Sequence, residues 1–263
     1  MSHHYRALWL SDVHLGTAPS RASDLLDFLD QVSANTLYLV GDIIDLERLK
    51  VKPIFPAAHR AVLGRLIHMA HSNTRVVFIP GNHDSEFRMV TGKEICGIEV
   101  HREVQHETAD GRQMLVFHGD TLDGAIRKGT NLEKFAAAAY TWLIEADVRI
   151  TALRQRFGAN FSPLITNIKN RLRSANEYIQ RFEVTAAEYA QARGFDGVIC
   201  GHIHRPGVMN IDGVLYANDG DWVEHRTALA EDEEGNLSLL RYRSDGIVVE
   251  TAKLVEYLAA CSF

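Results

Sequence analysis

The sequence predicts an α/β protein in which helices cover β-sheets. Short runs rich in Val, Ile and Leu have the length of buried strands, and amphipathic segments with helical spacing lie between them. Each of five such runs is followed within two residues by Asp, Asn or His. Alternating strand and helix signals favour a sheet with helices packed on it. With 263 residues and 46% hydrophobic content, the chain can form one large domain with a substantial core.

The strand predicted at residues 37–40 stops abruptly at Gly41 and Asp42. A buried strand that ends in this way delivers a carboxylate to the C-terminal edge of the sheet, where open α/β sheets hold their sites. A single Gly-Asp after a strand is also ordinary turn chemistry. The prediction of a site therefore depends on the recurrence of this arrangement along the chain.

Four further predicted strands, at 8–10, 76–80, 114–117 and 198–200, also end in polar side chains. These side chains offer oxygen and imidazole groups and no thiolate, a set that suits Mn, Fe, Zn or Mg rather than a structural thiolate zinc site. Two such ions can share one carboxylate, and we expect that carboxylate to be Asp42. The other polar side chains are Asp12 and His14, Asn82 with His83 and Asp84, His118 with Asp120, and His202 with His204.

Two amphipathic segments predict helices that cover the sheet. Residues 20–32 carry leucines at helical spacing, and residues 58–69 carry a second apolar stripe after two prolines. Three histidines lie on or beside the second helix and far from the strand ends. We expect them to be surface or packing residues rather than ligands. They are His59, His68 and His71.

Turn signals predict three hairpins, and the tail 251–263 favours a short helix. The first hairpin joins strands 98–103 and 113–117 through a turn at 109–111, the second spans 207–219 with its turn at 212–213, and the third spans 226–242 with its turn near 234–236.

After Asp120 the pattern changes to helix for residues 121–195, with an Ala-rich stretch at 135–144 and an apolar stripe from Leu164 to Ala186. We expect these residues to form a helical cap inserted between two ligand-bearing strands, within a single domain 1–263. The cap carries 11 Lys or Arg against 7 Asp or Glu, although the whole chain has a net charge of −6. This basic excess would attract an anionic substrate, but a solvated helical surface would show the same balance.

Composition excludes several classes of protein. Three widely spaced cysteines imply no disulfide framework and fit a reducing compartment. No secretory signal is visible, and the most apolar window, 135–144, is too short to span a bilayer. We therefore expect a soluble, cytoplasmic protein with no nucleic-acid partner, and the pattern carries no signal of an oligomeric state.

The motifs D-x-H, G-D, G-N-H-D, H-G-D and G-H-x-H, in this order from residue 8 to about 220, resemble the calcineurin-like metallophosphoesterase superfamily. The resemblance implies a metallophosphoesterase-type β-sandwich flanked by helices and two divalent ions, with Mn the first choice. It also implies a ligand set in which Asp42 bridges the ions, one ion binds Asp12, His14 and His204, and the other binds Asn82, His118 and His202.

The same resemblance implies a mechanism. Hydroxide bridging the ions would attack phosphorus in line. His83 would donate a proton or hydrogen bond to the leaving group, with Asp84 fixing its tautomer, and Asn82 would contact substrate as well as metal. Asp120 and Asn218 would either support the ligands from behind or simply cap turns.

Within the superfamily, the cap and the segments 118–122 and 202–206 resemble the UDP-2,3-diacylglucosamine pyrophosphohydrolases of lipid A biosynthesis, which release a lipid monophosphate and UMP. One departure is His83, where the best-known members have Arg, so the chain is nearer a sister subgroup. In that family a basic cap helix reaches the diphosphate and apolar walls hold acyl chains, although an apolar stripe is more often packing. The similar residues here are Arg171, Arg173, Ser174 and Asn176.

Two other functions stay open. The first is a metallophosphoesterase of a different nucleotide, phosphodiester or phosphoprotein, with the cap as a lid. The second is a non-enzymatic scaffold on the same fold, against which His83 and the full set of seven predicted ligands argue. On the lipid hypothesis, the enzyme would make peripheral contact with the cytoplasmic face of the membrane.

Overall fold

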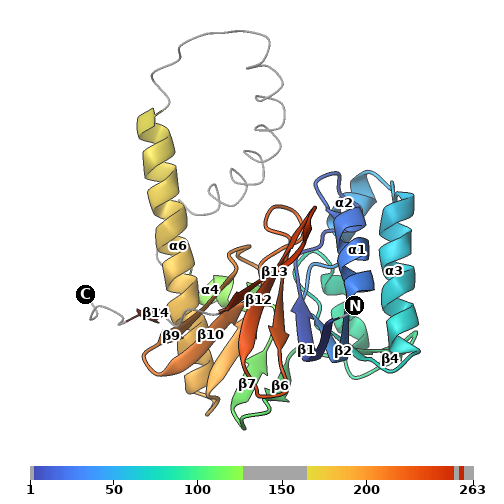
Figure 1. Ribbon diagram of the computed structural model, residues 1–263. Helices are drawn as coiled ribbons and strands as arrows, with labels where there is room; N and C mark the ends of the chain where they lie inside the picture. Colours follow the sequence, from blue (N-terminus) through green and yellow to red (C-terminus); the bar gives the residue numbers. More distant parts are fainter. Residues whose placement is uncertain (1–2, 127–164, 252–254, 258–263) are drawn as a thin grey trace. The chain divides into compact units, whose positions relative to one another are not determined.

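The computed structural model describes residues 3–126, 165–251 and 255–257 (Figure 1). Two compact units divide the chain, one of Met1–Thr121 with Ala186–Phe263 and the other of Leu122–Thr185. The first unit contains both β-sheets and every side chain predicted to bind metal. The second contains α4 (Asp123–Ile126) and most of α6 (Ile165–Gln191).

The larger sheet has eight strands, and its centre is parallel. Neighbours β1, β2, β3 and β5 run parallel, whereas β4, β11, β12 and β13 add antiparallel edges. In spatial order the strands are β13 (Gly246–Thr251), β12 (Leu237–Arg243), β11 (Thr227–Glu231), β1 (His3–Leu10), β2 (Val32–Leu39), β3 (Arg75–Phe78), β5 (Ile98–Val100) and β4 (Glu94–Ile95).

The smaller sheet has six strands, and β7, β8 and β10 form its parallel centre. A short strand follows residue 254, where the tail was predicted to be helical, so that prediction was wrong for these residues. In spatial order the strands are β14 (Val255–Tyr257), β9 (Gly207–Ile211), β10 (Val214–Asn218), β8 (Gly197–Cys200), β7 (Gln113–Val116) and β6 (Val104–Glu107).

Alternating residues of the central strands supply two separate cores, because successive side chains of a strand point to opposite faces. In β1, Ala7 and Trp9 join Met114 and Val116 of the smaller sheet in one buried cluster. The intervening Leu8 and Leu10 belong to a second cluster, shared with the helices. The two sheets therefore pack as a sandwich, and the larger sheet has a helix-covered outer face, as the predicted fold class requires.

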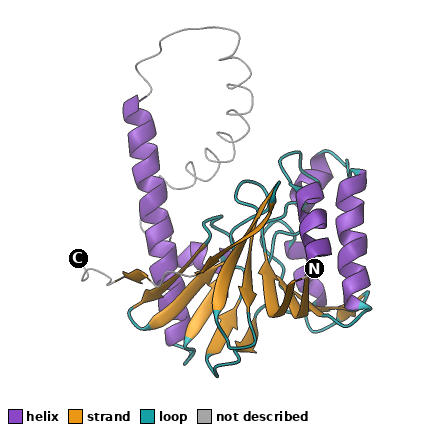
Figure 2. Cartoon of the chain, viewed as in Figure 1, coloured by secondary structure: helices purple, strands orange, loops and turns teal. Residues whose placement is uncertain are grey.

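Two helices provide most of that cover, α1 (Ala22–Gln31) and α3 (Ala57–Ala70) (Figure 2). Short helical elements follow two of the strands, namely α2 (Leu46–Val51) after β2 and the 3-10 helix η1 (Ser85–Val90) after β3. A further 3-10 turn, η2 (Asp120–Leu122), follows β7. Among the described residues, none of the helices has the length and apolar character needed to cross a membrane.

Most predicted elements are present, and the differences are local. The hairpins β9–β10 and β11–β12 are confirmed. The partner predicted for strand 113–117 was wrong, because β7 pairs with β6 and residues 98–100 form β5 beside β3 instead. Strand β2 begins at Val32, five residues before the apolar run that predicted it. The predicted Ala-rich helix at 135–144 lies outside the described residues.

Candidate metal centre

Side chains from separate loops converge at the C-terminal ends of five central strands. Asp12 and His14 follow β1, Asp42 follows β2, His118 follows β7 and His204 follows β8. Their ligand atoms form two groups, Asp12 with His14 and His204, and Asp12 with Asp42 and His118, each within 4.8 Å. The remaining two predicted ligands, Asn82 after β3 and His202 after β8, lie in the same set of loops.

The converging atoms approach one another without satisfying their hydrogen-bonding capacity. His204 Nε2 lies 3.0 Å from Asp12 Oδ1, and His118 Nε2 lies 3.5 Å from Asp42 Oδ2. Even so, Asp12 Oδ1, His118 Nε2 and Asn82 Oδ1 are buried with no hydrogen bond of acceptable geometry. Buried polar atoms are nearly always hydrogen-bonded. A cluster of buried oxygen and nitrogen atoms without hydrogen bonds therefore fits the coordination of divalent cations.

His118 is held in the form that a metal requires. Its Nδ1 lies 2.7 Å from the carbonyl oxygen of Val40, which can only accept, so Nδ1 carries the proton. This leaves a lone pair on Nε2, the atom that faces Asp42. Burial alone would raise the pKa of Asp42, but with no cation bound the protonated imidazole of His118 outweighs burial and lowers it to about 2. A metal ion at Nε2 would take the place of that second proton. The carboxylate thus stays ionised and favours positive charge beside it.

Backbone strain is concentrated in the predicted ligands. Positive φ angles, between 50° and 69°, occur at Asp12, His14, Asp42, His202 and His204. Eight of the described non-glycine residues have positive φ, and five of these eight are predicted ligands. Side chains disfavour this left-handed region by about 1–2 kcal/mol each, and such strain clusters at functional sites.

Two glycines of the motifs are present for steric reasons. A Cβ on Gly81 would lie 2.2 Å from Asp42 Oδ1 and 2.7 Å from His118 Nε2. A Cβ on Gly201 would lie 2.3 Å from the hydroxyl of Ser11. The loops after β3 and β8 therefore approach the ligand carboxylates more closely than any side chain would permit.

Asp12 is supported by a buried polar group that sequence reasoning missed. The Ser11 hydroxyl lies 2.6 Å from Asp12 Oδ2 and 2.6 Å from Asp219 Oδ1, and the backbone N–H of His202 donates to Asp12 Oδ2. Burial raises the pKa of Asp219 well above its usual value, which favours a neutral carboxyl able to share a proton with Ser11. One oxygen of Asp12 is thus fixed while the other faces the site.

Asp45 is a second residue that sequence reasoning missed. Its Oδ2 lies 3.3 Å from Nδ1 of His14 and 3.2 Å from Nδ1 of His83, and its Oδ1 accepts the N–H of Arg48 as the N-cap of α2. Burial opposes ionisation, but the contacts with His14 and His83 hold the pKa of Asp45 well below its usual value. One carboxylate therefore orients a predicted ligand and the predicted proton donor together.

The structure gives Asp84 a role different from fixing the His83 tautomer. Its buried carboxylate accepts backbone N–H groups of Gly81 at 2.6 Å and Ile43 at 2.8 Å, with Asp42 and Ile44 slightly farther away. Burial, reinforced by the charge of Asp42, raises the pKa of Asp84 to about 6. Asp84 thus ties the loop after β3 to the loop after β2, and Asp45 occupies the position beside His83.

Comparison with known proteins assigns the chain to a family. The profile of the calcineurin-like phosphoesterase family matches residues 5–206. The chain belongs to this family. A UDP-2,3-diacylglucosamine hydrolase from Edwardsiella ictaluri is 26% identical over 236 residues, covering 87% of this chain and 89% of the relative. One from Serratia proteamaculans is 26% identical over 215 residues, covering 78% and 84%.

Among solved structures, the phosphoesterase Yfce from E. coli is similar, with a TM-score of 0.47 and 17% identity over 94% of this chain and 99% of that one. Membership of the phosphoesterase family, together with the names of the sequence relatives, makes this protein a hydrolase. The family also implies divalent metals, with which the groups of acids and histidines in this phosphoesterase agree.

Of the other predicted site residues, Asp120 and Asn218 belong to the first unit of the phosphoesterase. Asp120 accepts two hydrogen bonds of 2.8 Å from Arg88, and buried Asn218 donates to the Gly201 carbonyl at 2.7 Å. Both support loops that carry ligands. Asn176 is exposed on α6, in the second unit, and the side chains of Arg171, Arg173 and Ser174 lie outside those described.

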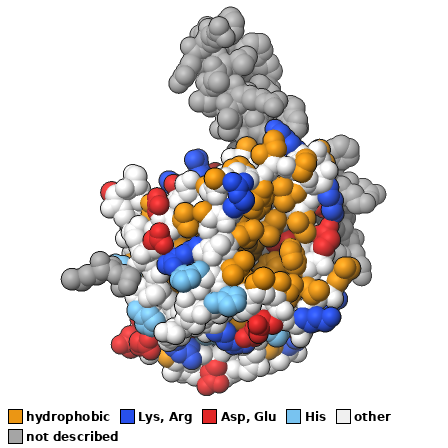
Figure 3. Space-filling model, turned by 90° about the vertical axis from the view of Figure 1, so that its right-hand side faces the viewer, with side chains coloured by type: hydrophobic (Ala, Val, Ile, Leu, Met, Phe, Trp, Pro, Cys, Tyr) orange, Lys and Arg blue, Asp and Glu red, His pale blue; other side chains and the backbone are white. Residues whose placement is uncertain are grey.

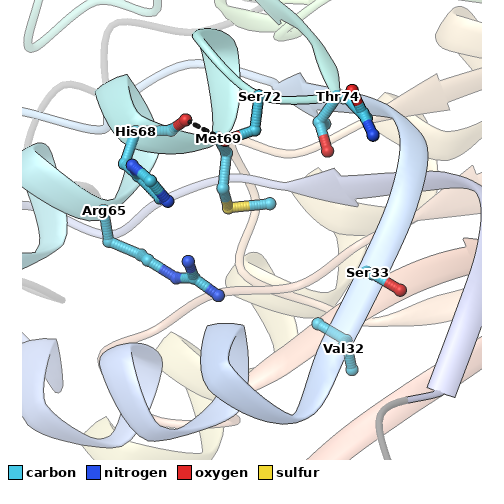
Figure 4. Close-up of a pocket in the computed structure, with 8 residues that line it drawn as sticks. Val32, Ser33, Arg65, His68, Met69, Ser72 and Thr74 are labelled. Atoms are coloured by element: carbon cyan, nitrogen blue, oxygen red, sulfur yellow. Dashed lines mark hydrogen bonds between the residues drawn. The ribbon is translucent and has the colours of Figure 1, made fainter.

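Two regions are separate from the metal centre. His59 is buried and accepts the N–H of Gly16, which agrees with the packing role predicted for it. A hollow of about 210 Å³ lies where α3 ends and β2 begins, lined by Ser33, Arg65 and His68 among others (Figure 4). Because Asp42 follows the opposite end of β2, this hollow is not the metal site.

Proposed function

We propose that the protein is a dinuclear-metal hydrolase that cleaves a phosphoester or pyrophosphate bond in a UDP-2,3-diacylglucosamine-like, lipid-linked diphosphate. The observation that carries the metal part is the convergence of buried, unpartnered ligand atoms at the strand ends. The names of the relatives support the substrate class.

Seven side chains would hold the two ions, with Mn the first choice. Two divalent ions bound there would supply Lewis acidity toward a phosphoryl oxygen and toward water. With only two carboxylates in the set, the centre would keep a net positive charge and attract an anionic phosphate. In this proposal Asp42 is shared, Asp12, His14 and His204 hold one ion, and Asn82, His118 and His202 hold the other.

His83 would assist departure of the leaving group. The contact of Nδ1 with Asp45 orients the imidazole and stabilises its protonated form, which leaves Nε2 as the polar atom available to substrate. A proton or hydrogen bond from His83 would neutralise charge that develops on the leaving oxygen. Asp45 acts here as a positioning residue, and Asp84 holds the loops together.

Substrate selection is assigned to the proposed cap, residues 121–195. The basic excess of this segment supports recognition of an anionic diphosphate, and we assign that contact to Arg171, Arg173, Ser174 and Asn176. Its apolar stripe would hold acyl chains. A substrate of this kind resides in a membrane, so the enzyme would work in peripheral contact with the cytoplasmic membrane face.

Product analysis by mass spectrometry tests this function. With Mn²⁺ and a detergent-dispersed UDP-2,3-diacylglucosamine, we expect a lipid monophosphate and UMP. Charge reversal at Arg171 and Arg173 should lower kcat/KM for this substrate at least tenfold and leave a small chromogenic phosphodiester unaffected. The matched control is Arg243→Glu, an exposed residue at the end of β12, which should change neither rate.

Acyl length provides an independent criterion. Each methylene removed from the substrate should weaken binding by up to ~0.8 kcal/mol if it leaves an apolar pocket. Equal losses on both substrates after charge reversal, or turnover indifferent to acyl length, would favour a phosphoesterase of a soluble nucleotide or phosphodiester. Metal-replete protein that hydrolyses no phosphate ester would favour the scaffold.

A further inference from the structure

An exposed apolar surface lies on the helical side of the first unit. It is formed by the end of α2, the proline-containing loop before α3, and η1. Figure 3, which faces this side of the molecule, shows hydrophobic side chains gathered there, with Lys and Arg as well as some Asp and Glu side chains around them. Val51 is 79% exposed, Met89 85% and Ile54 52%. We call this surface the apolar rim: Val51, Pro53, Ile54, Pro56, Ala57 and Met89.

The rim is joined directly to the metal centre. Helix α2 begins immediately after Asp45, and η1 begins immediately after Asp84. The backbone N–H of Leu46 donates to the carbonyl oxygen of His83, and Lys50 forms an ion pair with Glu86. The two elements that carry the rim are therefore tied to each other and to the loops of the site.

Positive charge predominates in the segment that carries most of the rim, in a chain that is acidic overall. Residues 46–60 contain four Lys or Arg and a single Glu, whereas the whole chain has a net charge of −6. Lys52 and Arg60, which flank the loop, are both exposed. Apolar side chains bordered by Lys and Arg match the interface of an anionic bilayer, in which apolar groups enter the acyl boundary and cations meet headgroups.

The shape of the rim favours a bilayer over a protein partner. Val51 and Met89 are so exposed that solvent surrounds most of each side chain. A protein surface would need matching pockets to bury such protrusions, whereas lipid chains rearrange around them.

We propose that the apolar rim is the surface by which this protein docks on an anionic lipid bilayer. The inference rests on the proposed function for its purpose, since docking would bring the metal centre to a membrane-borne substrate. Docking itself does not depend on that function, because the rim binds lipid surfaces whether or not they contain substrate.

Vesicle flotation without substrate tests the proposal. The full chain should float with vesicles of phosphatidylglycerol and phosphatidylcholine, and with pure phosphatidylcholine vesicles at least tenfold less. Ile54→Glu and Val51→Glu should each lower the bound fraction at least tenfold. The matched control is Val249→Glu on β13, where the wild-type side chain is also 52% exposed, and it should bind like wild type.

Hydrolysis of a small chromogenic ester, unchanged in all three variants, would establish that the fold and metal centre are intact. Equal binding by Ile54→Glu, Val51→Glu and wild type, or no vesicle binding by wild type, would overturn the proposal. A concentration-dependent dimer in analytical ultracentrifugation that Ile54→Glu dissolves would also overturn it, since the rim would then bind a second copy. Rim-dependent flotation without turnover of the lipid-linked diphosphate would refute the proposed function alone.

Discussion

At the residue scale, the centre brings together side chains from separate strand ends with Asp45, a carboxylate that contacts two histidines at once. Parallel strands end at one edge of a sheet, so polar side chains at five strand ends could be expected to meet, and Asp12, His14, Asp42, His118 and His204 do. The role of Asp45 was not predicted, because helix capping alone explains an Asp at the start of α2. Its spacing of three residues from Asp42 was the available signal.

The first prediction concerns the proton donor. We expect His83→Ala to lower kcat by about 10²–10⁴, the usual range for a lost acid, because its ring would donate to the leaving group. Metal content should stay near wild type, since His83 is not among the proposed ligands. Metal analysis of the purified variant checks the assignment, and loss of an ion would show that Asn82 and His83 have exchanged roles.

The second prediction concerns the carboxylate shared by two histidines. Asp45→Asn removes the charge beside Nδ1 of His14 and His83 at nearly constant size, so kcat should fall about 10- to 100-fold, as when the partner of a metal-bound histidine is lost. Glu47→Gln is the control, because exposed Glu47 lies 3.9 Å from His83 and approaches no predicted ligand. Similar rates for both variants would contradict the role given to Asp45.

At the element scale, hydrophobic pattern identified the strands whose buried residues are apolar. It missed β6, Val104–Glu107, because the buried side chain in this strand is His106. Its Nδ1 lies 3.0 Å from the hydroxyl of Tyr38 and its Nε2 lies 2.8 Å from buried Glu231. Burial of this histidine depends on partners 68 and 125 residues away, so local sequence gave it the appearance of a surface position.

The third prediction separates two glycines by their surroundings. Gly81→Ala would force a Cβ against Asp42 Oδ1, so we expect loss of bound metal and destabilisation by about 1–3 kcal/mol. Gly64→Ala in α3 meets nothing within 4 Å and should stabilise the protein by about 1 kcal/mol through helix propensity. Thermal unfolding and metal analysis of both variants check this. A fully loaded Gly81→Ala variant would show that the loops are looser than described.

At the scale of the whole molecule, alternating strand and helix signals predicted a sheet covered by helices, and the resemblance to metallophosphoesterases implied the sandwich. The order of strands across both sheets could not be predicted from the sequence. Strands β11, β12 and β13 extend the larger sheet beside β1, although they lie near the other end of the sequence. The extent of the cap also stays a prediction, although the second unit, Leu122–Thr185, falls within it.

The fourth prediction concerns metal and stability. Converging carboxylates and five predicted ligands with left-handed backbone disfavour the metal-free state. Ions that bind only the folded protein stabilise that protein by about 2.7 kcal/mol at a hundredfold excess over Kd. Chelation should therefore lower Tm by about 5–10 °C, given roughly 2–4 °C per kcal/mol for a chain of this size. Asp42→Asn should show little further change on chelation. A wild-type Tm indifferent to chelator would mean that no resident metal contributes to the fold.

We propose that seven side chains on five strand ends build a single centre for two ions. Anomalous scattering from a crystal grown with Mn²⁺ tests it most directly. The expected result is two peaks, both contacting Asp42. One would also contact Asp12, His14 and His204, and the other Asn82, His118 and His202. Absence of ions, a single ion, or ions held by other side chains would contradict the assignment.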